Sequence, residues 1–425
     1  MNRYIAILVL LALPAGGQPP LFLQSLLVEA LAHNPEVLRA QRMWEMARTK
    51  APQARALPDP MLQVGFERSP AFLREVQPLD AGHGDLPPEE MDMYMAGISL
   101  SQPIPYPGKR RLRQEKAEME AEAAGEMVEA ARRSVAARVQ AAYFDLAFAH
   151  QGLEVVERTR SLLRQFEETA RARYSVGQGM QQDLLKAQVE LSMLEQRRLS
   201  LEQRHHAAGS MLNSLLDRSP GQALDLPDTL GPPQPLLPPQ ELDRLALAHN
   251  PELRARQRGV EASQVEVALM RKEYRPDFAF SAGWQTRGGF DDLYQVMVEV
   301  ELPWQRQRRA YGVQEALAGH RAALEDRRAA EQMVLAQVRD FSSMATTAGR
   351  LVELYQAAIL PQAAFALESA LTAYRVGQVD FLMLLDNTRL LLENELMLRE
   401  QLADYHRAVA LLEEVVAAPV LAQEN

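Results

Sequence analysis

One stretch of the chain, from Pro107 to Pro220, contains no proline between its ends and is dense in Ala, Leu, Glu, Gln and Arg. These residues lose little side-chain freedom in a helix and are strong helix formers. A single interruption, Gly177-Gln178-Gly179, divides the stretch. We therefore expect two long helices joined by a tight turn, each arm of roughly 60 residues being about 90 Å long. A duct or a rod needs helices of that length, whereas an ordinary globular domain does not.

The composition narrows the classes of protein to which the chain can belong. It has 425 residues, enough for two or three domains, a formal net charge of -10 and no cysteine. Nucleic-acid-binding proteins usually carry a basic face, so an acidic chain argues against that class. Without cysteine there is no disulfide, no thiolate metal site, no cysteine nucleophile and no lipidated cysteine. We expect no resident metal and no cofactor.

The N-terminus has the pattern of a secretory signal. Arg3 precedes an apolar run over 5–13, and small residues follow at 14–17. This pattern is typical of a cleaved signal peptide, which we predict over 1–17; a buried strand or helix start is the alternative. No later stretch approaches the roughly 20 apolar residues of a membrane-spanning helix. Residence in a membrane would then require a β-barrel.

The order of elements occurs twice along the sequence. Leu-Ala-His-Asn-Pro-Glu at 31–36 recurs at 247–252, and the turn Tyr-x-Val-Gly-Gln at 174–178 recurs at 374–378. In Asn-Pro-Glu, asparagine suits the helix cap, proline the first helical position and glutamate the helix dipole. Each copy therefore marks a helix start, and the histidine before it is expected to be structural.

Two structural repeats follow from this duplication. We predict the first repeat over 18–219, a proline-rich linker over 220–240, the second repeat over 241–418 and a tail over 419–425. Each repeat is expected to contain a helix, two strands and a long helical hairpin. The expected strands lie at about 61–69, 91–101, 277–286 and 293–302, and the expected hairpins at about 107–216 and 305–416.

The four expected strands alternate between apolar and other side chains. In the first, Leu62, Val64 and Phe66 alternate with Gln63 and Glu67. Such alternation gives one apolar and one polar face, and segments of roughly 9–11 residues fit a tilted transmembrane strand. A small soluble sheet is the alternative. Aromatic residues that would suit membrane interfaces are Tyr94, Trp284 and Tyr294.

Four strands are too few to form a membrane barrel alone, since about eight are needed to close one around a filled interior. An open sheet edge cannot face lipid, because its backbone groups find no hydrogen-bond partners there. If these strands lie in a membrane, several copies of the chain must share one barrel. The signal sequence and the long helices favour that interpretation.

The arrangement after the signal resembles the TolC family of outer-membrane efflux ducts. The resemblance is carried by the two Asn-Pro-Glu starts, the two Tyr-x-Val-Gly turns, Leu57-Pro58-Asp59-Pro60, and the junction from Ser101 to Lys109. Pro-Asp-Pro-Met at 58–61 and Pro-Tyr-Pro-Gly-Lys at 105–109 are most similar to the heavy-metal branch, the CusC- and CzcC-like ducts of RND tripartite systems.

The resemblance implies a mainly α protein with a membrane β part. Long coiled α-hairpins would form a periplasmic α-barrel, and four transmembrane strands per chain would contribute to a shared twelve-stranded β-barrel in a homotrimer. Such a duct lies in the lipid of the cell outer membrane and works with a periplasmic adaptor and an inner-membrane RND pump. It would conduct cargo passively from the periplasm to the exterior, here heavy-metal cations.

Pore and tip residues follow from the strand pattern and from the resemblance. Polar strand positions are expected to line the pore: Glu67, Gln285, Gln295, Glu299 and Glu301. Glycine permits the positive φ that reverses a helix, so the two glycine turns should form the periplasmic tips. By resemblance, the tips meet the adaptor through Gly177, Gln178, Gly377 and Gln378.

Family members close the pore with acidic residues just past the second tip. Asp386 matches one such position, while Met383 departs from the other. Asp380 and Asp183 are further gate candidates, and ordinary solvated helix positions are the alternative for all three aspartates. Three copies of one acidic residue, brought together by threefold symmetry, would form a ring that favours cations.

Several other interpretations are weighed against a duct for metal ions, and one motif is weighed as a copper site. Met91, Met93 and Met95 would share a strand face, and thioether sulfur suits Cu(I), but a flexible strand end is the favoured interpretation. The sequence has no His-Glu-x-x-His, no Gly-x-Ser-x-Gly and no phosphate loop, so we expect neither an enzyme nor catalytic residues. A periplasmic coiled-coil scaffold or adaptor would leave the strands unexplained. Drug export and type I secretion stay open, because the pump chooses the cargo.

Overall fold

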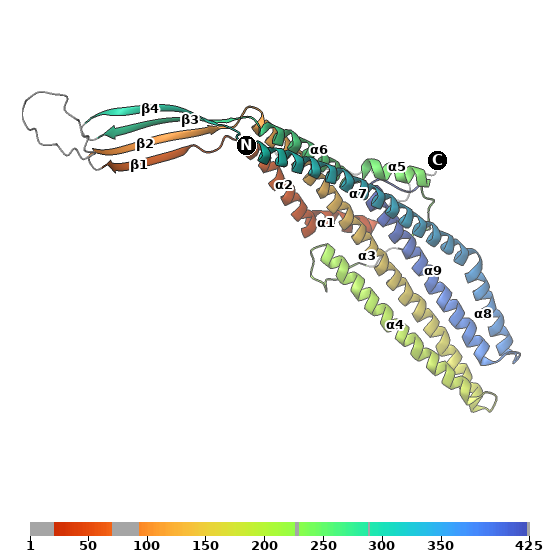
Figure 1. Ribbon diagram of the computed structural model, residues 1–425. Helices are drawn as coiled ribbons and strands as arrows, with labels where there is room; N and C mark the ends of the chain where they lie inside the picture. Colours follow the sequence, from red (N-terminus) through yellow and green to blue (C-terminus); the bar gives the residue numbers. More distant parts are fainter. Residues whose placement is uncertain (1–20, 70–92, 226–228, 288–289, 423–425) are drawn as a thin grey trace, which may run out of the picture. The chain divides into compact units, whose positions relative to one another are not determined.

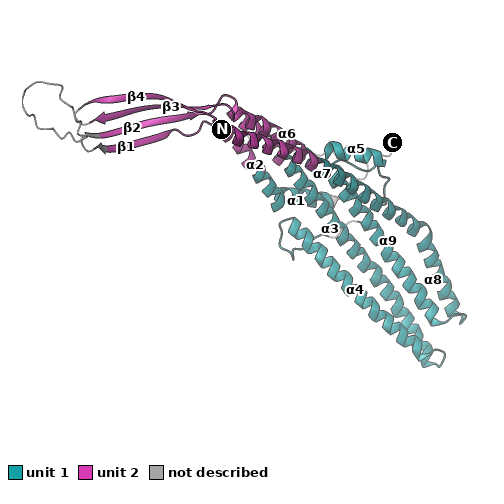
Figure 2. Ribbon diagram, viewed as in Figure 1, with its two compact units in different colours: residues 1–43, 125–255, 328–425 teal, residues 44–124, 256–327 magenta. Residues whose placement is uncertain are grey.

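The computed structural model of the protein describes residues 21–69, 93–225, 229–287 and 290–422 (Figure 1). The predicted signal peptide lies outside the described residues. The chain divides into two compact units (Figure 2): unit 1 comprises residues 1–43, 125–255 and 328–425, and unit 2 comprises 44–124 and 256–327. The fold is mainly helical with one four-stranded antiparallel sheet, which confirms the predicted fold class.

The four strands of the described residues lie in unit 2 and form a single sheet. They are β1 (Met61–Ser69), β2 (Met93–Ile104), β3 (Asp277–Arg287) and β4 (Phe290–Glu301), paired in that order. The β2–β3 pairing joins strands from the two halves of the sequence. β2 extends past the predicted end through Pro103, which lies beyond the last pair with β1. Proline is tolerated at such an edge position of a sheet.

Long helices make up most of the rest of the chain. The first hairpin is α3 (Lys109–Ser175) and α4 (Gln181–Leu215); the second is α7 (Arg306–Leu354), the π turn η1 (Tyr355–Ile359), α8 (Leu360–Arg375) and α9 (Phe381–Val416). Shorter helices precede each pair of strands: α1 (Leu21–His33), α2 (Pro35–Arg55), α5 (Pro239–His249) and α6 (Pro251–Lys272). Within the described ranges, no helix has both the length and the apolar character needed to cross a membrane.

The second hairpin departs from the uninterrupted helices that the sequence predicts. Its first arm contains Pro361, which has no N–H to donate and whose ring crowds the carbonyl one turn earlier. The helix widens into a π turn over Tyr355–Ile359, shortly before this proline, and π turns are one way in which a helix absorbs such a defect. The corresponding arm α3 has no proline and runs for 67 residues without a break.

The hairpin helices of unit 1 pack at a regular spacing. On α4, Ala187, Leu194, Leu201 and Ala208 recur every seventh residue, and all four are buried. A seven-residue apolar repeat keeps one side of a helix facing its partner, as in a coiled coil. Gly152 of α3 faces this row, since a Cβ there would lie 3.2 Å from a methyl group of Leu201. The absence of a side chain at Gly152 therefore permits close approach of the two arms.

Two buried asparagines connect helix ends within unit 1. Asn34, between α1 and α2, accepts the Glu36 N–H at 2.9 Å, and its Nδ2 donates to the Leu215 carbonyl at the end of α4, also at 2.9 Å. Asn250, between α5 and α6, accepts the Leu253 N–H at 3.0 Å, and its Nδ2 donates to the Val415 carbonyl at 2.9 Å. The two side chains are 3% and 6% exposed. The capping role expected of Asn-Pro-Glu is confirmed, and each asparagine also satisfies a carbonyl of a distant helix.

The proline-rich linker is held against the C-terminal segment of unit 1. Leu236 bridges Leu421 in an antiparallel pair. The Tyr405 hydroxyl of α9 donates to the Gln234 carbonyl at 2.7 Å and accepts the Gln234 N–H at 2.9 Å. Described parts of the linker and of the tail therefore pair with each other. Residues 226–228 and 423–425 lie outside the described residues.

A buried lysine connects the sheet to the helices within unit 2. Lys109, the first residue of α3, is 1% exposed, and its Nζ lies 2.9 Å from Asp277 and 3.0 Å from Glu273. Asp277, the first residue of β3, also accepts the Tyr106 N–H at 2.6 Å. The Lys109 ammonium thus joins the first turn of α3 to the start of β3 and to the segment that follows α6.

We expect Asn250→Ala to lower the free energy of unfolding by about 2–4 kcal/mol, because it removes a helix cap and leaves a buried carbonyl without its donor. His249→Ala, which changes the exposed neighbour, should change stability by less than about 0.5 kcal/mol. Denaturant unfolding followed by circular dichroism compares the two variants. Equal stabilities would contradict a stabilising role for the asparagine.

A second prediction concerns pH. Burial raises the pKa of the Glu413 carboxyl on α9 to about 7, and the nearby charge of Arg133 opposes this shift. Because the folded state binds this proton more tightly than the unfolded chain does, stability falls as pH rises from about 4.5 to about 7. In the wild type, the free energy of unfolding should fall by on the order of 3 kcal/mol over this pH range, and we expect Glu413→Gln to remove that fall. Denaturant unfolding at pH 5 and pH 8 measures this difference in stability, and Glu414→Gln is the control. If Glu413→Gln still loses as much stability between the two pH values as the wild type, Glu413 is not its cause.

Candidate functional site

The sheet of unit 2 has one face that is apolar across all four strands. Two of its rows of paired positions are Leu62–Leu100–Ala282–Val296 and Val64–Ile98–Trp284–Tyr294. These side chains are open rather than covered by the chain: Val64 is 77% exposed and Val296 is 83% exposed. Contiguous apolar surface of this kind marks contact with a membrane or with another protein.

The opposite face of the sheet carries the polar residues that the sequence singles out. All five occupy positions that alternate with the apolar rows: Glu67, Gln285, Gln295, Glu299 and Glu301. They come from three different strands, and the register brings them to one surface. Their role in lining a pore stays a prediction.

A depression lies on the sheet, and most of the residues that line it belong to the polar face. Residues from all four strands line a depression of about 570 Å³, among them Gln63, Glu67, Met95, Gly97, Gly283, Gln285 and Gln295. A Cβ on Gly97 would lie 3.1 Å from the Trp284 carbonyl oxygen, and one on Gly283 would lie 2.9 Å from the Ser99 Cβ. Glycine at these positions allows β2 and β3 to approach closely and allows the sheet to curve toward its polar face.

Each helical hairpin of unit 1 reverses at a glycine with positive φ. The angle is +73° at Gly177 and +75° at Gly377. In both turns the following N–H, from Gln178 or Gln378, donates to the carbonyl five residues earlier, at 2.8 and 2.9 Å. This pattern satisfies the free carbonyls at a helix end and favours glycine at the reversal. The four predicted tip residues thus form the turns, and their contact with an adaptor stays a prediction.

A residue that the sequence reasoning missed ties the two tips together. Arg173 Nη2, near the end of α3, donates to the Tyr374 and Arg375 carbonyls of α8 at 3.2 and 3.3 Å, and its guanidinium carbon lies 4.4 Å from the Tyr374 ring centre. A cation at a helix C-terminus is stabilised by the dipole, and over an aromatic face by the ring. Burial raises the pKa of Tyr374; Arg173 opposes this, and the Asp183 charge adds to it. The sequence offered one sign that Arg173 is special: the two copies of the turn differ here, and Ala373 occupies the equivalent position in the second copy.

The three aspartates expected near a gate lie in different environments. Asp380 is the N-cap of α9, where its carboxylate accepts the Met383 N–H at 3.0 Å. Asp183 lies in the first turn of α4, where its charge complements the helix dipole. Asp386 is exposed, one turn before Arg389, and within the described ranges its carboxylate accepts no hydrogen bond. Asp380 and Asp183 therefore stabilise the starts of their helices, Asp386 is exposed, and the role of all three aspartates in a gate stays a prediction.

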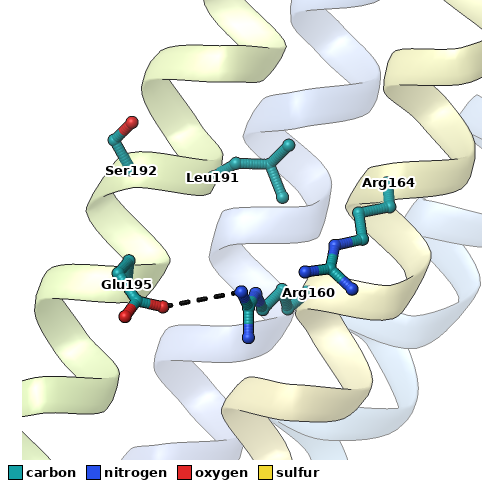
Figure 3. Close-up of a pocket in the computed structure, with 5 residues that line it drawn as sticks. All are labelled: Arg160, Arg164, Leu191, Ser192 and Glu195. Carbon is teal, nitrogen blue, oxygen red and sulfur yellow. Dashed lines mark ion pairs between the residues drawn. The ribbon is translucent and has the colours of Figure 1, made fainter.

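Other charged groups of unit 1 lie on the surfaces of its helices. In the part of the chain that the structure describes, no three His, Asp or Glu side chains are grouped as metal ligands would be. A shallow hollow of about 320 Å³ lies between α3 and α4 (Figure 3), lined by Arg160, Arg164, Leu191, Ser192 and Glu195. Arg160 and Glu195 are 3.7 Å apart across it. This contact is an ion pair between the surfaces of the two helices.

Solved structures share this fold over nearly the whole chain. The outer membrane protein VceC of Vibrio cholerae is 19% identical, with a TM-score of 0.77 over 93% of this chain and 96% of that one. CusC is 17% identical, with a TM-score of 0.78 over 93% and 92%. The MtrE outer membrane channel of Neisseria gonorrhoeae, solved in its open state, is 18% identical, with a TM-score of 0.74 over 93% and 88%. None of the curated proteins matches this sequence. The architecture is that of outer-membrane channels.

The chain belongs to the outer membrane efflux protein family, whose model matches residues 26–217 and 242–418. The two matched ranges fall on the two halves of the sequence, and the gap between them falls on the linker. Members of this family are channels rather than enzymes.

We expect Arg173→Met to loosen the contact between the tips by about 1 kcal/mol, because a hydrogen-bonded cation over an aromatic ring is lost. The chain has no cysteine, so spin labels on cysteines placed at Val176 and Val376, both 67% exposed, report the distance between the turns. Pulsed electron resonance should give a broader distance distribution in the variant.

Arg171→Met is the matched control, because Arg171 pairs with Glu167 of its own helix at 2.7 Å. It should leave the distribution unchanged. A distribution that is equally narrow in wild type and in Arg173→Met would show that other contacts hold the tips.

Proposed function

We propose that this chain forms the outer-membrane exit duct of a tripartite efflux system. Three copies share one twelve-stranded barrel in the outer membrane, and their hairpins form an α-barrel in the periplasm. Cargo passes through passively, driven by an inner-membrane RND pump that a periplasmic adaptor links to the duct. The observation that carries the proposal is an open sheet that is exposed and apolar on one face, and polar and hollowed on the other.

The edges of the sheet support a shared barrel. In the described residues, β1 pairs on one side with β2 and β4 on one side with β3, so each has an open edge. Lipid offers no hydrogen-bond partners to an open edge, and a sheet in a membrane must therefore close on itself. Pairing β4 of one copy with β1 of the next closes a ring. If the sheet curves toward its polar face, the depression lined by Gly97 and Gly283 lies inside this barrel.

The dimensions of the apolar face fit a bilayer. Eight residue steps separate Tyr294 from Leu302, and at about 3.3 Å each they cover roughly 26 Å along a strand. A tilt of about 40° reduces this length to roughly 20 Å, close to the apolar band of about 25 Å that membrane barrels present. Exposed side chains along this line are Tyr294, Val296, Val298, Val300 and Leu302.

Exposed apolar residues on the helices support association of copies. Leu185, Val189 and Met193 lie on successive turns of α4 and are 45–59% exposed. A helix that leaves an apolar stripe open in one chain is suited to pack against a neighbouring chain. These three residues lie outside the buried seven-residue row of the same helix.

The tips are the proposed site of adaptor binding and gating. The turns at Gly177, Gln178, Gly377 and Gln378 would meet the adaptor, and Asp386 from three copies would form the acidic ring. Asp183 and Asp380 would contribute to the gate by holding the tip helices through their helix-end contacts. Opening by a shift of rigid helices would have to break the Arg173 tie.

Heavy-metal cations are the proposed cargo. The motifs at 58–61 and 105–109 support this, as does the presence of CusC among the similar structures. Acidic Glu67 and Glu299 lie on the polar face, and the register sets Met95 opposite Glu67. Met91 lies outside the described residues.

The face assignment is tested by two neighbouring substitutions. Val296→Arg should reduce outer-membrane assembly, because an arginine on the lipid side costs about 2–4 kcal/mol near the midplane. Gln295→Arg, on the polar face, should assemble normally and shift the ion selectivity of the pore toward anions. Membrane fractionation, gel mobility with and without heating, and bilayer conductance report these results.

Wild type should form a heat-sensitive oligomer of about three chains in the outer-membrane fraction. A soluble periplasmic monomer would overturn the proposal. Equal tolerance of both substitutions would overturn the face assignment.

A further inference from the structure

The connectors between the sheet and the helices of unit 2 are strongly basic. We define the basic belt as residues 48–60, 103–113, 271–277 and 302–311, which are the four connectors with their adjoining helix ends. The belt contains thirteen Lys and Arg residues against three acidic residues, whereas the whole chain has a net charge of -10. A concentration of one charge sign against the overall balance indicates a surface for a partner of opposite charge.

Two of the three acidic residues of the belt are already occupied. Glu273 and Asp277 both contact the buried Lys109, which leaves Asp59 as the remaining acid. Arg306 and Arg308 at the start of α7 are exposed, and within the described ranges neither forms an ion pair. Most of the positive charge of the belt is therefore available at the surface.

The position of these charges is unfavourable for the helices themselves. α3 begins Lys-Arg-Arg and α7 begins Arg-Gln-Arg-Arg, and neither has an acidic residue in its first turn. A helix N-terminus is the positive end of the dipole, so an unpaired cation there is repelled. An anion bound from outside would offset this repulsion.

The belt continues the apolar face of the sheet. The alternation of Val298 and Val300 on β4 runs on through Leu302 to Trp304, whose side chain is 81% exposed. The Trp304 N–H donates to the Leu302 carbonyl at 2.9 Å and the Arg306 N–H donates to the Trp304 carbonyl at 2.8 Å, which fixes the connector in two narrow turns. An exposed tryptophan between an apolar band and arginines is typical of the level of lipid headgroups.

We infer that the basic belt binds the headgroups of anionic phospholipids, with Arg306, Arg308 and Trp304 at its centre. This inference rests on the proposed function, because it requires the apolar face to lie in a membrane. The phosphates of the adjoining leaflet would meet the arginines and the N-terminal turns of α3 and α7, while the indole would lie at the boundary with the acyl chains. The belt would thus set the depth of the sheet in the bilayer and enrich anionic lipid around it.

Tryptophan fluorescence tests the inference in the full chain. The sequence has three tryptophans, so Trp44→Phe with Trp284→Phe leaves Trp304 as the reporter. The protein is reconstituted in phosphatidylcholine vesicles that contain an equal minor fraction of either brominated phosphatidylglycerol or brominated phosphatidylcholine. We expect the anionic lipid to quench Trp304 at least about twofold more strongly, and the preference to shrink as salt rises.

Arg306→Gln with Arg308→Gln should bring the two quenching levels together while quenching by phosphatidylcholine persists. Arg197→Gln with Arg321→Gln, exposed arginines outside the belt, makes the same change in net charge and should keep the preference. Equal quenching by both lipids in the reporter protein, or loss of the preference in the control pair, would overturn the inference and leave the membrane placement intact. No quenching by either lipid would overturn the membrane placement itself.

Discussion

Two buried amide side chains determine where the long hairpins of unit 1 end. Asn34 and Asn250 join residues 181 and 165 positions apart, and each satisfies a helix start and a helix end at once. A side chain for this task must accept one hydrogen bond and donate another over a short reach, which excludes aspartate and any apolar residue. The ends of α4 and α9 therefore depend on the same chemistry, repeated once in each half of the chain.

Features that follow a local period were predictable from the sequence. The alternation of Leu62, Val64 and Phe66 against Gln63 and Glu67 placed strands and faces correctly, because side chains on a strand alternate strictly between its two sides. The reversals at Gly177 and Gly377 were equally readable, since a positive φ at a helix end favours glycine. The Asn-Pro-Glu motif identified helix starts, although the second partner of each asparagine could not be read from the motif.

Features that depend on which segments meet in space were not predictable. Arg173 donates hydrogen bonds to the end of α8, about 200 positions away along the chain. The residues around Arg173 do not identify this partner. The basic belt is dispersed over four separate segments, so its charge is evident only when the sheet brings the connectors together. Asp380 has a second contact that its acidity alone does not indicate: its carboxylate accepts the Met383 N–H and caps α9, while its role in a gate stays a prediction. Pro361 was visible in the sequence, but the π turn that accompanies it was not.

The pairing of β2 with β3 has a consequence for the order in which the molecule folds. Met95 and Arg287 are partners although about 190 residues separate them along the chain. The pairs β1–β2 and β3–β4 each close a shorter loop, and loop-closure entropy grows with loop length, so we expect the central pairing to form last. Until then, the apolar face exists only as two narrow halves. A chain built in this way completes its most aggregation-prone surface after the helices have folded.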